Sequence, residues 1–125
     1  MKLSTLLTIN AIVAVLFGLV FLLIPATAMS WYGIQLSDAG LFTARLFGAA
    51  LLNFAIISWL VRGSAGSEVV RSIALSFSIG DLIGFIVSLI YQLQGVANSL
   101  GWSTVVIYLL LGLAFGYLYL TNPGE

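Results

Sequence analysis

Four long runs of apolar residues, separated by short polar segments, make up most of the chain. They cover about residues 3–29, 40–61, 70–93 and 100–120, and none shows the alternation of a half-buried strand. At a rise of about 1.5 Å per residue, each run is long enough for a helix to cross the roughly 30 Å hydrocarbon core of a bilayer. The pattern therefore predicts four membrane-spanning helices in a single domain, residues 1–125.

The segments between the runs carry residues that begin and end helices. Pro25 interrupts the first run, Ser37 precedes the second, and Ser67 ends a glycine-containing turn before the third. Because the bilayer core holds no water to satisfy the backbone, helices are the expected spanning structure, and the short links make successive helices antiparallel neighbours. The predicted fold is all-α: a membrane-embedded antiparallel four-helix bundle in up-down-up-down order.

The composition supports a membrane location and excludes several kinds of catalytic and binding site. Of the 125 residues, 62% are hydrophobic and only 6% are charged, a balance far from that of soluble domains. The chain has no cysteine and no histidine, which excludes disulfides, thiolate nucleophiles, histidine-ligated metals and a Ser-His-Asp triad. The four basic residues are scattered, so they leave no electrostatic footprint for nucleic acid.

The positions of the charges predict an orientation. Four crossings place the N- and C-termini of the chain on the same side of the membrane. Lys2, Arg62 and Arg71 fall on that side, whereas Asp38 falls on the other. By the positive-inside rule, we expect the N- and C-termini in the cytoplasm. The first apolar run is longer than the apolar region of a secretory signal, so we expect it to be retained as a span.

Arg45 and Asp81 lie well inside apolar runs. Counted from the inner end of the bundle, Asp81 lies roughly 22 Å along the third helix and Arg45 roughly 28 Å along the second. An ionised side chain at the centre of a spanning helix costs about 2.5–3.5 kcal/mol, so Asp81 must either pair with Arg45 or take up a proton. We expect the ion pair, with Asn53 as a third polar partner; a structural and a functional role for it both stay open.

Small and polar residues recur at helical spacing on each run, which predicts a row on the inner face of each helix. Further candidates for a ligand or ion pathway are Ser78, Ser88 and Tyr108. Glycine allows two helices to approach closely, and the candidate packing positions are Gly18, Gly80, Gly84, Gly112 and Gly116. An alternative use of the interior is a groove for an apolar ligand, bounded by Phe77, Asp81, Tyr91 and Tyr108.

The stretch WYGIQLSDAGLFTARLFGAALLNFAIISWLVR, which follows soon after Pro25, resembles small bacterial four-helix membrane proteins of the DoxX-like type or a related family. In these proteins a first helix ends near a proline, and the second opens with an arginine shortly before a glycine, here Arg45-Leu46-Phe47-Gly48. The resemblance implies a compact bundle in a bacterial cytoplasmic membrane, with a polar pocket toward its outer half. Such proteins sometimes work beside redox or respiratory partners. Arg45 is the one residue of this sequence that we match to a position in the family's pattern.

Three functions follow from these observations. The first is a non-enzymatic accessory or assembly component with a buried Arg45–Asp81 seam. Its lipid-facing apolar surface and rows of small residues would contact a second copy or a larger membrane complex. The second is a small oligomeric transporter or channel that uses Asp81 as a proton or cation site. The third is a protein that binds a lipid, quinone or pigment. The four carboxylates fall too far apart for two of them to share a scissile bond or a metal, so we expect no enzymatic activity; the sequence specifies no cofactor.

Overall fold

The structure is a computed structural model that describes residues 1–121, and all regular secondary structure in this part of the chain is helical. The long helices are α1 (Leu3–Leu23), α3 (Asp38–Val61), α4 (Glu68–Leu93) and α5 (Gly101–Thr121). The short helix α2 (Pro25–Trp31) and a 3-10 turn, η1 (Arg62–Ser64), complete the described elements. By length and composition, four helical segments can each cross a membrane, which confirms the prediction of four long apolar helices.

The first predicted helix, residues 3–29, is wrong in its extent, because the chain breaks at Ile24 into α1 and α2. Pro25 has no N–H to donate to the Phe21 carbonyl, so the last bond of α1 runs from the Ile24 N–H to the Val20 oxygen at 2.9 Å. Pro25 instead takes the first position of α2, where a helix needs no N–H donor.

The predicted serine caps at two helix starts are confirmed. The Ser37 hydroxyl accepts a bond from the Gly40 N–H at 3.1 Å, at the start of α3. The Ser67 hydroxyl accepts one from the Val70 N–H at 3.2 Å, at the start of α4. Each cap satisfies one of the backbone donors that a helix leaves unpaired at its N-terminus.

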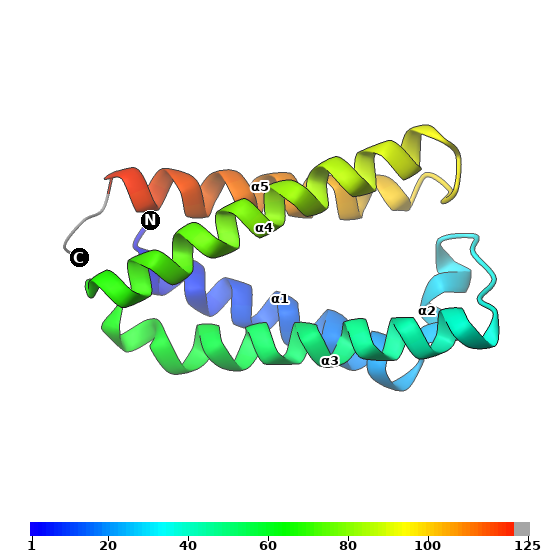
Figure 1. The fold of residues 1–125 in the computed structure, drawn as a ribbon, viewed down its shortest axis with the longest axis horizontal. Coiled ribbons are helices and arrows are strands. Elements are labelled where there is room, and N and C mark those ends of the chain that lie inside the picture. The colour runs from blue at the N-terminus through cyan, green and yellow to red at the C-terminus, as the bar shows by residue number, and fades with distance from the viewer. Residues whose placement is uncertain (122–125) are drawn as a thin grey trace.

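The long helices pack as two pairs, α1 with α3 and α4 with α5 (Figure 1). Glycine brings the first pair together: a Cβ added at Gly48 would lie 2.6 Å from the Leu22 nitrogen and 2.8 Å from the Gly18 oxygen. In the second pair, a Cβ at Gly112 would lie 2.9 Å from the Leu82 side chain, and one at Gly116 would lie 2.8 Å from the Ser78 hydroxyl. Only hydrogen fits at Gly48 in the first pair, where the neighbouring atoms are backbone, whereas a larger residue in the second pair would displace the Leu82 or Ser78 side chain.

The remaining predicted packing glycines, Gly80 and Gly84, differ from each other. A Cβ at Gly84 would lie 2.5 Å from the Tyr108 ring, so Gly84 seats that ring against α4. Around Gly80 no atom lies within 4 Å of such a Cβ, and the residue is exposed. The prediction that Gly80 packs against a neighbouring helix is therefore wrong, because the space beside it belongs to a cavity.

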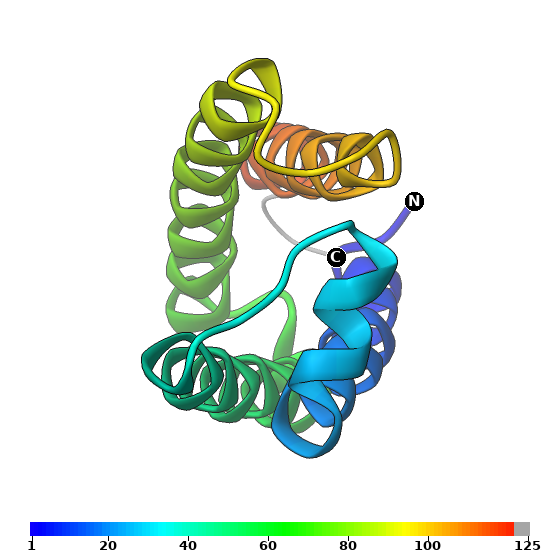
Figure 2. The same cartoon turned by 90° about the vertical axis from the view of Figure 1, so that its right-hand side faces the viewer.

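The two helix pairs converge at one end and diverge at the other (Figure 1). At the converging end, buried apolar residues from α1, α4, α5 and the turn before α4 form one cluster. Its members are Leu3, Leu6, Leu7, Ala65, Val70, Ala74, Phe115 and Leu118. Seen from the diverging end, the long helices stand in a ring, and the chain that follows α2 runs across it (Figure 2).

The divergence overturns one expectation about neighbours. The short η1 turn was expected to make α3 and α4 a closely packed hairpin, but their backbones do not run together along their length. They meet through side chains such as Phe54 and Phe77, whose ring centres are 6.0 Å apart. A short link fixes where two helices start, and packing against other helices decides where they go.

Candidate functional site

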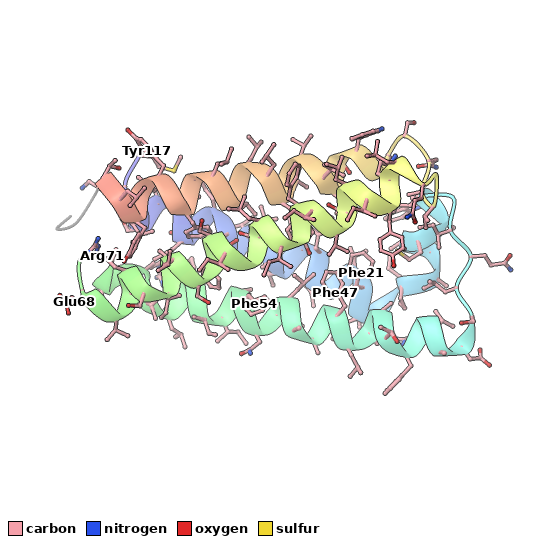
Figure 3. All side chains as sticks on the ribbon, turned by 45° about the horizontal axis from the view of Figure 1, so that its top comes forward. Phe21, Phe47, Phe54, Glu68, Arg71 and Tyr117 are labelled. Atoms are coloured by element: carbon pink, nitrogen blue, oxygen red, sulfur yellow. The ribbon has the colours of Figure 1, made fainter. Side chains whose placement is uncertain are left out.

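A cavity of about 540 Å³ lies between the two helix pairs. We call it the Asp81 cavity, because Asp81 is the one charged residue in its wall within the described part of the chain. Figure 3 labels three of its aromatic side chains, Phe21, Phe47 and Phe54, which lie along the middle of the molecule. The aromatic residues of the wall are Phe17, Phe21, Tyr32, Phe47, Phe54, Phe77 and Tyr108.

The polar part of the wall is small and comes from three helices. Asp81 on α4 is half-buried, as is Tyr108 on α5, whose ring packs on Gly84 one turn beyond Asp81. Asn10 from α1 also reaches this wall, with Ser76 and Thr104 as further hydroxyl groups. An apolar cavity with a few polar groups has the composition of a small-molecule site.

The predicted ion pair between Arg45 and Asp81 does not form. The Arg45 guanidinium donates a hydrogen bond to the backbone carbonyl of Leu22 on α1, and Arg45 lines neither this cavity nor its neighbour. The physical reason is the helix break: Pro25 ends α1 early, and the last carbonyls of a helix lack intrahelical donors. They carry the negative end of the helix dipole, so a guanidinium is a favourable partner.

The polar contacts inside each helix pair also differ from the prediction. Asn53 is exposed, so it is not the expected third partner of Asp81. The buried polar contact of the first pair is instead the bond from Asn10 to the Ser58 hydroxyl, at 2.9 Å. Ser78 is buried between α4 and α5 and donates to the Gly112 carbonyl at 2.7 Å, which makes it a packing residue.

A second cavity of about 620 Å³ adjoins the first toward the diverging end of the bundle. The two share the wall residues Phe21, Tyr32, Phe47 and Thr104. Ser88 and Tyr91 line this second cavity, whereas Phe77, Asp81 and Tyr108 of the predicted groove line the first. The second cavity therefore lies next to the Asp81 cavity, with these four residues between them.

One residue ties the two helix pairs together at the diverging end. Asn98, in the link between α4 and α5, donates from its side chain to the Trp31 carbonyl at 3.1 Å and from its backbone to the Tyr32 carbonyl at 2.9 Å. Within each pair, by contrast, side-chain hydrogen bonds join the two helices directly. Asn10 bonds to Ser58 between α1 and α3, and Arg71 bonds to the Tyr119 carbonyl at 2.7 Å between α4 and α5. Asn98 is therefore a latch between two internally tied units.

Removing the side chain of the latch is expected to open the diverging end. Asn98→Ala deletes the bond to Trp31 as well as the one from the Leu100 N–H to the Asn98 side chain, at 3.0 Å. Spin labels placed at Gln35 and Gln94 report the distance across this end, and we expect a longer and broader distribution in the variant. Ser99→Ala is the matched control. Asn98→Ala keeps the backbone bond from Asn98 to the Tyr32 carbonyl, so an unchanged distribution would show that this bond and apolar packing hold the end closed without the side chain.

Sequence reasoning missed Ser58, Gly48, Asn98 and most of the aromatic wall. Ser58 and Gly48 had a usable signal, because counting about 1.5 Å per residue places them level with Asn10 and Gly18 on α1. Asn98 had none, since it depends on how a link meets a helix far away in the sequence.

Comparison with known proteins adds no assignment, because no protein-family model, curated protein or solved structure matches the chain. The resemblance to the DoxX-like type therefore stays a prediction. Within residues 1–121 no three His, Cys, Asp or Glu side chains gather where they could hold a metal ion. The geometry defines an aromatic cavity with one carboxyl group, set between two pairs of apolar helices.

Proposed function

We propose that this protein is a polytopic membrane protein that binds an apolar small molecule in the Asp81 cavity without transforming it. We place it in a bacterial cytoplasmic membrane as an antiparallel four-span bundle with both termini in the cytoplasm. Large apolar side chains on all four long helices support the embedding; Leu16, Leu60, Ile83 and Leu110 are between 57% and 73% exposed. Soluble proteins rarely expose apolar surface so extensively.

The observation that carries the proposal is the cavity itself. Its volume of about 540 Å³ lies within the range of small-molecule sites, roughly 300–1,000 Å³. A protein whose only task is to dock against others gains nothing from an aromatic cavity between its helices, since tight packing would stabilise it more. The accessory-component hypothesis also loses the buried Arg45–Asp81 seam that was predicted with it, because Arg45 bonds to the Leu22 carbonyl instead.

Transport is a second candidate, favoured by how the helices are joined. Side-chain bonds tie α1 to α3 and α4 to α5. The two pairs are connected by a cluster at one end, by the Phe54–Phe77 ring contact, and by the Asn98 latch at the other end. Two such units can move relative to each other around a ligand, as in hinge or shear motions. Ligand-driven flux in liposomes, reduced by crosslinking the two pairs at the diverging end, would favour transport over binding alone.

The binding proposal is tested by filling the cavity. In Gly80→Leu the new side chain starts in open space and borders the cavity, so we expect a folded protein that has lost its ligand. Native mass spectrometry of protein extracted in mild detergent detects a bound small molecule directly. Gly63→Leu is the control, because its Cβ also meets nothing within 4 Å and Gly63 lines neither cavity. Equal ligand retention by both variants would contradict a site in this cavity.

A further inference from the structure

The chemistry of the cavity wall specifies more than an apolar ligand. Asp81 is the one charged residue lining either cavity within the described residues, and neither wall holds a lysine or arginine. Arg45, the counter-ion predicted from its depth in the bundle, is already engaged with the Leu22 carbonyl. The Asp81 carboxyl group therefore has no cation from its own protein, and of its two alternatives, pairing with Arg45 or taking up a proton, only the proton remains until a cation from outside replaces it.

Aromatic rings that line the same cavity as Asp81 also favour a positively charged ligand. Phe54 and Phe77 meet edge to face at 6.0 Å between centres, and Phe21 and Phe47 do so at 5.3 Å. The face of an aromatic ring attracts cations, by about 2 kcal/mol or more where water is excluded. A carboxyl group and aromatic rings in one cavity are complementary to a cation with an apolar body.

We propose that the ligand of the Asp81 cavity is a lipophilic organic cation, such as a quaternary or protonated amine with alkyl or aryl substituents. Its charge pairs with the Asp81 carboxylate, and its apolar part contacts the phenylalanine rings and Tyr108, which line the same cavity. This inference rests on the proposed function, because it names the class of molecule that the same cavity binds.

Other ligand classes fit the wall less well. An anionic lipid or a carboxylate would meet Asp81 with no basic side chain to offset the repulsion. A neutral hydrocarbon would fill the volume but leave the carboxyl group without a partner in an apolar setting, which is costly. A cation removes that cost, and a bare metal ion is disfavoured because the wall offers a single carboxylate.

The test uses two probes of nearly the same shape that differ in charge, benzyltrimethylammonium and neopentylbenzene. Binding of each to the full chain in lipid nanodiscs is measured by saturation-transfer NMR, with empty nanodiscs correcting for partition into lipid. We expect the wild-type protein to prefer the cation by at least about tenfold, the equivalent of one good ionic contact. In Asp81→Asn this preference is lost, while affinity for neopentylbenzene changes by less than about threefold.

Controls separate the two proposals. Asp38→Asn removes the same charge at an exposed residue outside both cavities, and it should keep the preference for the cation. Asp81→Glu keeps the charge and should keep most of the preference, which guards against a folding defect in Asp81→Asn. Equal binding of both probes, unaffected by Asp81→Asn but weakened by Gly80→Leu, would overturn the cation inference and leave the binding site standing. Failure of both probes to bind would overturn both proposals.

Discussion

Gly48→Ala is expected to destabilise the protein by about 1–3 kcal/mol, although alanine normally stabilises a helix relative to glycine. The added Cβ would lie 2.6 Å from the Leu22 backbone nitrogen and 2.8 Å from the Gly18 oxygen. Backbone atoms cannot rotate away as a side chain can, so α1 and α3 must separate. Thermal unfolding of the detergent-solubilised protein measures the change.

The same substitution at Gly80 is the control with the opposite expected sign. Gly80 also lies within a long helix, but its added Cβ would meet no atom within 4 Å. Gly80→Ala should therefore gain about 0.5–1 kcal/mol, because alanine loses less conformational entropy on folding than glycine does. If the two variants shifted stability in the same direction, the close contact of α1 and α3 at Gly48 would not exist in the folded protein.

The helices themselves were predictable from the sequence, because they depend on local features. Apolar runs of sufficient length, serine caps and Pro25 act within a few residues of where they stand. The predicted bounds of the three later helices agree with the structure to within two residues at each end. The error at the first helix came from extending an apolar run through Pro25, where the loss of one backbone donor outweighs hydrophobicity.

The sequence predicted how far along its helix each polar residue lies, but not which neighbouring helix its side chain contacts. Counting along the helices puts Arg45 at about the same level as Leu22 on α1, and within about 6 Å of the level of Asp81 on α4. Depth alone cannot choose between these two neighbours. The choice depends on the divergence of the helix pairs and on a backbone carbonyl, and hydrophobic patterns report neither.

Arg45→Met is expected to cost about 1.5–3 kcal/mol, the usual worth of a hydrogen bond to a charged group. Methionine keeps much of the apolar stem but cannot donate to the Leu22 carbonyl. Since Arg45 and Asp81 do not contact each other, Asp81→Asn should have the same effect on stability with or without Arg45, to within about 0.5 kcal/mol. Unfolding of the two single variants and the double variant, measured in one detergent, gives this coupling energy.

A second double-mutant cycle, which pairs Arg45→Met with Pro25→Ala, tests whether Arg45 stabilises the helix break. Pro25→Ala restores a backbone N–H at the break, so α1 can continue and supply its own donors to the carbonyls that precede the break. Arg45→Met should then cost less in the Pro25→Ala background than in the wild-type protein, because the Leu22 carbonyl no longer depends on the guanidinium. If Arg45 were coupled energetically to Asp81 and not to Pro25, the two side chains would form the ion pair after all. Asp81 would then have a partner, and the proposed cation site would be contradicted. If Arg45 were coupled to Pro25 alone, Arg45 would stabilise the helix break, and the Asp81 carboxyl group would be free to bind the ligand.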